Sequence, residues 1–336
     1  MLVSEIADLL GYEMAGEDCP VNGVKWFDFA TEDDIAVIRE RENLNHTKAK
    51  EILTQPIFIP TDKTLLVTYD DVDFSIVKLC EVFIKKGVLH DYRIPIKYNH
   101  NDSGFYVGND CVISENAVIQ PGAMIGDNVI ISDNCYIDSY VSIGSGTVLG
   151  EGVRIGSGSK IGIPSFYHYY DDEQIKQFDG CGIVKIGRET VIGCNTSIQR
   201  GTISDTVIGE NTMIGNSIDI GHDVRIGSNC KIVSQTGIAS CVQIKDNVTI
   251  YGQVGINNNV VVGNNVVVKG RSIVTKSVND NEVIYGPFGR KYSDEMRLIA
   301  KMKYFFLLRN GFSVYDSPQK ISDIIWLKRI VKILQK

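Results

Sequence analysis

The sequence has little that would hold the protein on a nucleic acid or in a membrane. Its 34 lysines and arginines are outnumbered by 41 aspartates and glutamates, which gives a formal net charge of −7. A general nucleic-acid binder should carry a basic face, so we expect no nucleic-acid partner. No apolar run is long enough to span a bilayer, and Met1 to Glu5 lack the basic start and apolar core of a signal peptide. We therefore expect a cytoplasmic protein that does not associate with a membrane.

The middle of the chain carries a six-residue repeat of branched aliphatic residues. Each is commonly followed by Gly or another small or polar residue. A period of six matches neither a helix nor an ordinary strand, and it is typical of a solenoid in which short strands alternate with tight corners. The sequence thus predicts a mainly β protein built on a parallel β-helix. The repeat comprises Val107, Ile113, Ile119, Ile125, Ile131, Ile137, Ile143, Leu149, Ile155 and Ile161, then Ile186, Ile192 and Ile198, then every sixth residue from Ile208 to Val274.

Paired cysteines are absent. The eight cysteines are scattered singly, with no C-x-x-C pair, which argues against a disulfide framework or a metal site. Cys111, Cys135 and Cys230 each stand four residues after a repeat aliphatic, where the pattern elsewhere places Val, Thr or Ala. We interpret them as small core residues, and a reducing cytoplasm fits them best.

Acidic and amide pairs recur at equivalent positions of the repeat, where the chain should turn a corner. They could bind metal, but Asn and Asp also suit the unusual dihedral angles of a corner, and we favour that interpretation. The pairs are Asp127-Asn128, Glu210-Asn211, Asp246-Asn247 and Asn264-Asn265.

The repeat divides the chain into three regions. We expect a small α/β domain at residues 1–104, the solenoid at 105–285 and a helical region at 286–336. The last helix mixes apolar residues with lysine and arginine. It could lie on a membrane surface, although packing against the solenoid or a sister helix is the interpretation we favour.

The first region contains both kinds of secondary structure. A short helix is expected at Ser4 to Leu10, ended by Gly11, and strands are expected near Pro56–Pro60 and Leu65–Tyr69. Val72 to Lys86 has the apolar spacing of an amphipathic helix.

The repeat is interrupted twice. A loop of about residues 163–184 leaves one corner, and a two-residue insertion falls within 199–205. Long loops on a rigid scaffold are where binding residues concentrate. The aromatic residues of the first loop could stack on a nucleoside base or anchor the loop to a neighbouring subunit, and we take Phe166 and Tyr169 as candidate substrate-binding residues.

One histidine, His222, stands within the regular coils, in the motif Ile220-Gly-His-Asp-Val-Arg-Ile-Gly. The stretch from Asn195 to Gly227 around it resembles the centre of the bacterial UDP-3-O-acylglucosamine N-acyltransferases. These belong to the left-handed β-helix hexapeptide-repeat acyltransferases. The resemblance extends over nearly the whole chain and includes the insertion at 199–205. It implies a left-handed helix with 18-residue coils, C-terminal helices and a homotrimer with an active site between adjacent prisms.

The same resemblance assigns roles at the site. An amine attacks a thioester only as the free base, and His222 corresponds to the general base that takes its proton. The backbone N–H of Ser240, eighteen residues on, corresponds to the donor that stabilises the oxyanion. Asn216 and Asp219 are candidates to orient the base or hold the sugar.

Two departures from that family bear on the substrate. The lipid A enzymes carry an aromatic-x-x-Asn-Pro-Lys-Tyr run that grips uracil, where this chain reads Ala36 to Glu42. They also have a second active-site histidine, where this chain has Asn259, which we take as a substrate contact.

With these changes the chain looks like the N-acyltransferases of nucleotide-linked deoxyamino sugars, such as the anthrose-pathway enzyme that acts on dTDP-4-amino-4,6-dideoxyglucose. That similarity implies a coenzyme A thioester as acyl donor. Lys269 and Arg271 could meet its phosphates, and we expect no metal.

Other interpretations remain open. A lipid A N-acyltransferase that uses acyl carrier protein is the rival in the same reaction class, and a non-catalytic scaffold is the rival outside it. A γ-type carbonic anhydrase would need three converging histidines, and only His222 stands in the coils. A sugar nucleotidyltransferase would need a Gly-rich phosphate loop near the N-terminus, and none is present.

Overall fold

The structure is a computed structural model that describes residues 1–38, 47–55, 63–92, 96–286 and 299. Met1–Gly286 form one compact unit. The helices expected after residue 286 lie outside the described residues, and the division into three regions stays a prediction. No helix among the described residues has the length and apolar character needed to cross a membrane.

The N-terminal region is a five-stranded sheet with two α-helices. The strand order is β1-β5-β4-β3-β2, with β1 antiparallel to β5 and the other neighbours parallel. Its elements are α1 (Val3–Leu10), β1 (Glu13–Ala15), β2 (Gly23–Trp26), the 3₁₀ helix η1 (Phe27–Phe29), β3 (Asp34–Val37), β4 (Glu51–Thr54), β5 (Thr64–Val67) and α2 (Val72–Lys85).

Both helices begin and end within one residue of the expected bounds. Gly11 ends α1 in the left-handed conformation, with φ 69°, a region that glycine enters without steric cost. The carboxylate of Asp71 caps α2 by accepting the N–H groups of Asp73 and Phe74. The strand expected at Leu65–Tyr69 is present as β5, whereas the one expected at Pro56–Pro60 lies outside the described residues.

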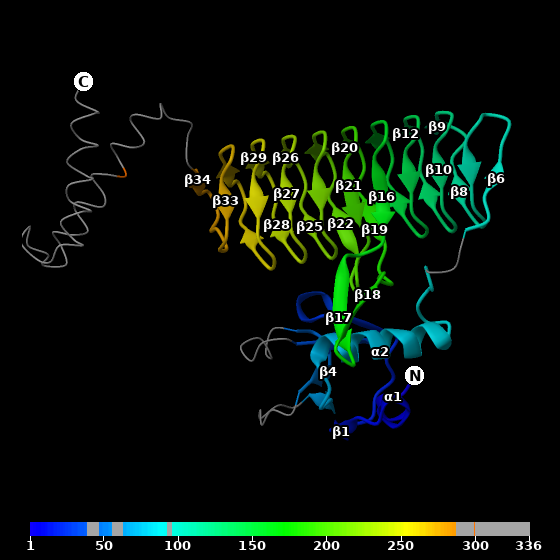
Figure 1. The fold of residues 1–336 in the computed structure, drawn as a ribbon, viewed down its shortest axis with the longest axis vertical. Helices are drawn as coiled ribbons and strands as arrows, with labels where there is room; N and C mark the ends of the chain where they lie inside the picture. Colours follow the sequence, from blue (N-terminus) through cyan, green and yellow to red (C-terminus); the bar gives the residue numbers. More distant parts are fainter. Residues whose placement is uncertain (39–46, 56–62, 93–95, 287–298, 300–336) are drawn as a thin grey trace, which may run out of the picture. The chain divides into compact units, whose positions relative to one another are not determined.

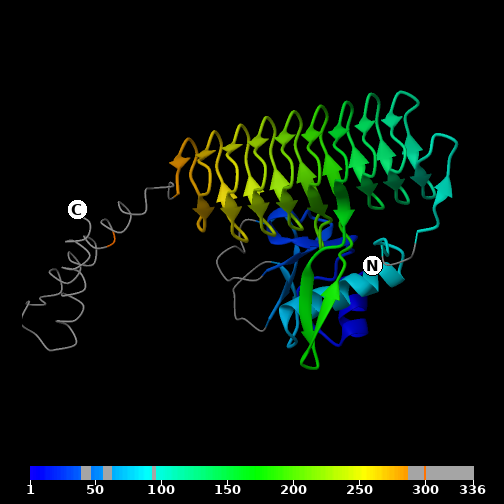
Figure 2. The ribbon, with the colours of Figure 1, turned by 45° about the horizontal axis from the view of Figure 1, so that its top comes forward.

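The solenoid consists of three sheets whose neighbouring strands are parallel, apart from one terminal antiparallel pair (Figures 1 and 2). The first sheet contains β6 (Asn99–His100), β7 (Tyr106–Val107), β10 (Met124–Ile125), β13 (Ser142–Ile143), β16 (Lys160–Ile163), β21 (Ser197–Gln199), β24 (Asp219–Ile220), β27 (Gly237–Ile238), β30 (Gly255–Ile256) and β33 (Ile273–Val274). The second contains β8 (Val112–Ile113), β11 (Ile130–Ile131), β14 (Val148–Leu149), β19 (Val184–Ile186), β22 (Thr206–Ile208), β25 (Arg225–Ile226), β28 (Gln243–Ile244) and β31 (Val261–Val262). The third contains β9 (Val118–Ile119), β12 (Tyr136–Ile137), β15 (Arg154–Ile155), β20 (Val191–Ile192), β23 (Met213–Ile214), β26 (Lys231–Ile232), β29 (Thr249–Ile250), β32 (Val267–Val268) and β34 (Val283–Ile284).

The repeat aliphatics form the core of this solenoid. Each strand is short, so one residue points inward and its neighbour points outward. Ile220, for example, is fully buried and pairs with Ile238 one coil away, while Asp219 beside it is exposed. The prediction of a mainly β, parallel solenoid of hexapeptide repeats is therefore confirmed.

The corners use the residues that the sequence indicates. Asn128, Asn211, Asn247 and Asn265 all have φ between 52° and 59°, a left-handed region in which Asn is enriched. The prediction that these pairs serve corners is confirmed.

The three cysteines assigned to the core form hydrogen bonds with backbone carbonyl groups. The thiols of Cys111, Cys135 and Cys230 each donate to a carbonyl one coil on, at 2.9, 3.1 and 3.1 Å. Cys135 and Cys230 are buried and Cys111 is half-buried. They pack as small core residues, as expected.

The loop that interrupts the repeat is a β-hairpin. Its strands are β17 (Tyr167–Asp171) and β18 (Gln174–Phe178), and it leaves the solenoid between β16 and β19. The hairpin extends from the solenoid alongside α2 (Figures 1 and 2). The hairpin therefore links the solenoid corner between β16 and β19 to the N-terminal region.

Candidate functional site

The candidate site is formed by three consecutive coils of the solenoid. In each coil the chain turns a corner between the first sheet and the second, and these three corners stack on one another. His222 and Asp223 follow β24 at this corner, and Ser240 with Cys241 follows β27 one coil on. In the coil before, the corner is the segment between β21 and β22, which holds the two-residue insertion. Residues far apart in sequence are thereby stacked in space.

The imidazole of His222 is held on one side and nearly buried. Its exposed fraction is 6%, and its Nδ1 lies 2.7 Å from Asp223 Oδ2 and 3.1 Å from Thr202 Oγ1. A carboxylate can only accept, so Nδ1 carries the proton and Nε2 is left with its lone pair. That tautomer is the one a general base needs.

Asp223 is fixed by the insertion. Its carboxylate is fully buried and accepts the N–H of Thr202 at 2.9 Å and the N–H of Ser204 at 2.8 Å. Ser204 in turn accepts the N–H of Trp26 through Oγ at 3.2 Å. Hydrogen bonds to a buried carboxylate are stronger than neutral ones, so the insertion orients the acid that orients His222.

Ser240 stacks one coil on from Gly221, the residue before the histidine. The N–H of Cys241 donates to the carbonyl of His222 at 3.0 Å, which sets the two corners in register. Within the described part of the chain, the N–H of Ser240 has no acceptor. At equivalent positions of other coils, the N–H groups of Ser228 and Asp246 donate to side chains one coil on, whereas those of Ser234 and Asn258, like that of Ser240, have no acceptor among the described residues. An N–H left without an acceptor beside a base has the arrangement of an oxyanion donor.

The hairpin contributes a tyrosine to this corner. Tyr167 is buried, its ring meets the His222 ring edge-on with centroids 5.7 Å apart, and its hydroxyl donates to Asp73 Oδ1 at 2.5 Å. The predicted Tyr169 instead stacks on Phe74 of α2, with centroids 6.0 Å apart. The predicted Phe166 is 70% exposed. Of these three aromatics, only Tyr167, which was not among the candidates, lies against His222.

Neither of two predicted polar residues is among the hydrogen-bond partners of the imidazole in the described part of the chain. Asp219 is on the outer face of β24, and desolvation raises the pKa of its carboxyl. Asn216 is at the other end of β24, where its Oδ1 accepts the N–H of Cys194 at 2.8 Å. Asp223 and Thr202 hold the histidine instead. The signals that could have identified them are the acid directly after His222 and the insertion itself.

The remaining candidates occupy two other places. Asn259 is exposed, one coil beyond Cys241 at the same corner, and its N–H donates to the carbonyl of Ser240 at 3.2 Å. Lys269 and Arg271 follow β32 at a different corner, between the third sheet and the first. Arg271 Nε donates to Gln253 Oε1 at 2.9 Å. Within one chain, the structure does not bring these two cations to His222.

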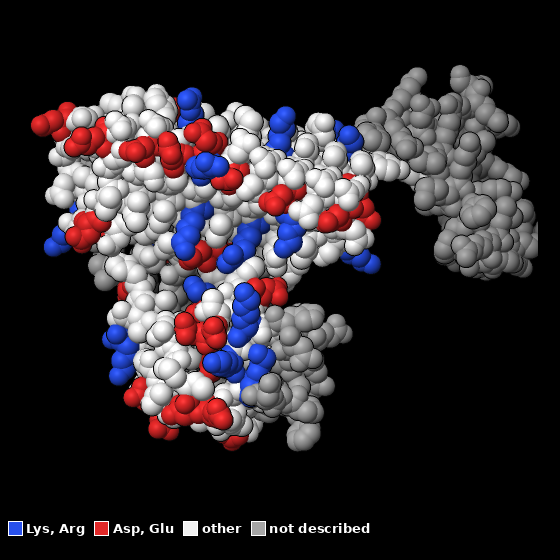
Figure 3. Space-filling view, turned by 180° about the vertical axis from the view of Figure 1, so that it is seen from behind, with Lys and Arg blue, Asp and Glu red and all other residues white. Residues whose placement is uncertain are grey.

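Basic side chains gather where the solenoid faces the N-terminal region (Figure 3). The guanidinium of Arg225 lies 3.7 Å from the centre of the Phe29 ring, and burial lowers its pKa. Lys185 Nζ is 2.7 Å from Asp205 Oδ2. Burial opposes ionisation of Asp205, but Lys25, Lys185 and the N–H of Ile183 outweigh it, so the pKa of this carboxyl is lowered.

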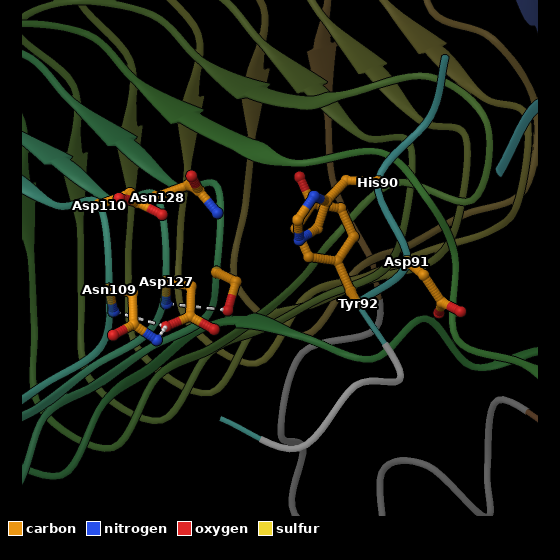
Figure 4. A pocket seen from close by; sticks show the side chains of 8 residues that line it. His90, Asp91, Tyr92, Asn109, Asp110, Asp127 and Asn128 are labelled. Carbon is orange, nitrogen blue, oxygen red and sulfur yellow. Dashed lines mark hydrogen bonds between the residues drawn. The ribbon is translucent and has the colours of Figure 1, made fainter. Parts of the chain in front are cut away.

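A separate polar cavity of about 180 Å³ lies at the same corner in earlier coils (Figure 4). His90, Asp91 and Tyr92 form one wall, and corner residues such as Asp127 and Ser145 form the other. None of the residues that line it belongs to the group around His222, so the cavity is not part of that site.

The chain resembles several known proteins. A family model described as bacterial transferase hexapeptide (six repeats) matches residues 106–137, 129–162 and 205–240. No curated protein matches the chain in sequence.

Among solved structures, a UDP-N-acetylglucosamine acyltransferase of Francisella novicida is 25% identical, with 68% of this chain and 88% of that chain covered and a TM-score of 0.46. The UDP-N-acetylglucosamine O-acyltransferase of Moraxella catarrhalis is 21% identical, with 70% and 94% covered and a TM-score of 0.50. A GDP-perosamine N-acetyl transferase mutant of Caulobacter crescentus, in complex with CoA and GDP-perosamine, is 12% identical, with 52% and 53% covered and a TM-score of 0.21. The Moraxella likeness supports the solenoid fold.

Proposed function

From the match of residues 106–162 and 205–240 to the hexapeptide-transferase family model, we propose that the chain is an acyltransferase acting on nitrogen. The proposed reaction moves an acyl group from coenzyme A to the amine of a nucleotide-linked deoxyamino sugar, with dTDP-4-amino-4,6-dideoxyglucose as the proposed acceptor. The proposed enzyme is a cytoplasmic homotrimer.

The observation that carries this proposal is the arrangement around His222. The Asp223 carboxylate, 2.7 Å from Nδ1, leaves Nε2 free to accept a proton. The N–H of Ser240, which has no acceptor among the described residues, stands one coil on at the same corner. A base and an oxyanion donor side by side suit attack of an amine on a thioester.

The proposed mechanism follows from these groups. As the amine nitrogen bonds to the thioester carbonyl carbon, Nε2 of His222 takes the amine proton and Asp223 stabilises the resulting imidazolium. The carbonyl oxygen becomes an oxyanion that accepts the Ser240 N–H. Collapse of this intermediate breaks the carbon–sulfur bond, and the thiolate of coenzyme A takes the proton back from the imidazolium. The products are an amide and free coenzyme A.

The choice of a substrate other than a UDP-linked acylglucosamine rests on the N-terminal region. Where the lipid A enzymes carry their uracil grip, Ala36 and Val37 are buried within β3, so neither side chain is available to a base. Residues 39–42 lie outside the described residues. Among the other candidates, Phe166, Asp219 and Asn259 are exposed and available to a ligand.

Tyr169 stacks on Phe74 and Asn216 accepts the N–H of Cys194, and both stay proposed substrate contacts. In the proposed trimer, Lys269 and Arg271 would contact the coenzyme A phosphates from a neighbouring prism.

A coupled assay tests the proposal against its main rival. The purified protein is given acyl-coenzyme A with dTDP-linked amino sugars, and separately acyl carrier protein with UDP-3-O-acylglucosamine. We expect turnover of the first pair. Turnover of the second pair alone would make the protein a lipid A enzyme, and consumption of neither thioester would favour a scaffold. A thermal-shift series with dTDP, UDP, GDP and coenzyme A identifies the nucleotide, because a ligand of the native state raises its melting temperature.

A further inference from the structure

One group of potential metal ligands stands out among the described residues. A ring nitrogen of His222, a carboxylate oxygen of Asp223 and the sulfur of Cys241 all lie within 4.8 Å of one another. His222 and Asp223 are buried and Cys241 is half-buried. The proposed mechanism uses the first two residues and has no use for the thiol.

From this geometry we propose that the three side chains form a binding site for a thiophilic divalent cation such as Zn²⁺, and that an ion bound there switches the proposed base off. Nitrogen, oxygen and thiolate sulfur are the ligands of zinc and cobalt, whereas magnesium and calcium prefer oxygen alone. The site would hold an inhibitor and not a cofactor.

The backbone places the three ligands in advance. Asp223 and Cys241 occupy the same corner position one coil apart, with left-handed φ angles of 58° and 60°. The hydrogen bond from the Cys241 N–H to the His222 carbonyl, at 3.0 Å, ties the two corners together. Tetrahedral zinc with bonds of about 2.0–2.3 Å separates its ligands by roughly 3.3–3.8 Å. Side-chain movements of roughly one ångström would therefore close the group on an ion.

The groups that surround Asp223 suit a metal ligand. The N–H groups of Thr202 and Ser204 hold the Asp223 carboxylate at 2.9 and 2.8 Å, which is how outer partners orient metal ligands. Because a carboxylate offers about four lone pairs, Asp223 can keep both of these bonds and still bind an ion. Cys241 is half-buried and packs against the hydrophobic cluster that includes Tyr167.

Occupation of the site would stop proton transfer. An ion on Nε2 occupies the lone pair that the base needs. An ion on Nδ1 takes the place of the proton that His222 shares with Asp223, and the neutral ring then keeps its proton on Nε2. The thiol of Cys241 loses its proton to solvent as it binds. A ring protonated at Nε2 cannot accept a proton from the amine. This consequence rests on the proposed function, but ion binding itself does not.

Cobalt provides a test that is independent of acyl transfer. Tag-free full-length protein is titrated anaerobically with Co²⁺, and thiolate-to-cobalt charge-transfer absorption is followed together with Co²⁺ stoichiometry. We expect one Co²⁺ per chain with a thiolate band, loss of that band in Cys241→Ser, and an unchanged band in the control Cys194→Ser, which alters a half-buried cysteine at another corner. No thiolate band in the unmodified protein, or a band that survives in Cys241→Ser, would overturn the site.

Zinc inhibition tests the functional half. We expect Zn²⁺ to inhibit acyl transfer by the unmodified protein and by Cys194→Ser at the same concentration. Inhibition of Cys241→Ser, measured relative to that variant's own activity without metal, should need at least about tenfold more Zn²⁺. Loss of a residue that only orients a metal ligand already weakens metal affinity on that scale. Equal inhibition of all three proteins would show that this ion does not act through Cys241. If no acyl transfer is found at all, the proposed function fails, while the cobalt result still decides the metal site.

Discussion

Replacing Asp223 by Asn tests how the structure holds its base. The carboxylate accepts three donors: the N–H of Thr202, the N–H of Ser204 and Nδ1–H of His222. An amide has one acceptor oxygen, and its NH₂ group must face at least one of these donors. In the best orientation the amide oxygen still accepts the hydrogen bonds from Thr202 and His222, and the N–H of Ser204 is left without an acceptor.

The magnitude follows from that count. An unsatisfied buried N–H costs about 1–3 kcal/mol. The two bonds that remain become neutral and lose about half their strength, which adds roughly 1–2 kcal/mol. We therefore expect Asp223→Asn to lower the free energy of unfolding by about 2–5 kcal/mol. Turnover should fall by about 10²-fold or more, because the imidazolium loses its counter-charge.

The matched control is Asp219→Asn, the same chemical change on the exposed face of the neighbouring strand. Denaturant unfolding and the rate of coenzyme A release are measured for both variants and the unmodified protein. Asp219→Asn should stay close to the unmodified protein in stability. If Asp223→Asn matched Asp219→Asn in both unfolding midpoint and turnover, the carboxylate would have no role in holding the base.

Three further outcomes follow from the same structure. The pKa of Asp205 is lowered in the folded protein, where Asp205 pairs with Lys185, so its ionised form stabilises the fold. This contribution is fully present above about pH 4, the ordinary pKa of Asp, and is lost as pH falls through the pKa of the folded state. Asp205→Asn should thus be less stable by about 1–3 kcal/mol at pH 7, and a melting-temperature difference that stayed constant from pH 7 to pH 3 would argue against this. Tyr167→Phe removes the hydrogen bond to Asp73 and keeps the ring against His222, so unfolding should become easier by about 1–3 kcal/mol while turnover changes little, and a large loss of turnover would assign the hydroxyl a catalytic role. Sedimentation at micromolar concentration should show a trimer, and a monomer there would remove the proposed cleft between subunits.

The solenoid could be predicted because its signal is local and repeated. One inward aliphatic every six residues defines the strands, and asparagines with positive φ mark the corners, as Asn211 and Asn247 do. The helix from Val72 was predictable for a similar reason, since its apolar spacing and the capping Asp71 lie within one segment.

The partners of His222 were harder to predict because they depend on how the coils stack. Thr202 is 20 residues before the histidine and reaches it only across a coil boundary. The hairpin was missed because its turn, Asp172–Glu173, has φ angles of 47° and 62°, a conformation usually signalled by Asn-Gly. Because the turn was not recognised, the sequence did not show which side chains of β17 are buried and which are exposed. In the structure Tyr167 is buried toward the histidine, and Phe166 just before it is exposed.

The central claim, that His222 is the base of an acyl transfer, is tested most directly by one comparison. Coenzyme A release at neutral pH is measured with acyl-coenzyme A and dTDP-4-amino-4,6-dideoxyglucose, for the unmodified protein and for His222→Ala. We predict that the variant loses about 10²- to 10⁴-fold in turnover while its unfolding midpoint shows that the fold is kept. A folded His222→Ala protein that retained more than about a tenth of the turnover would contradict the claim.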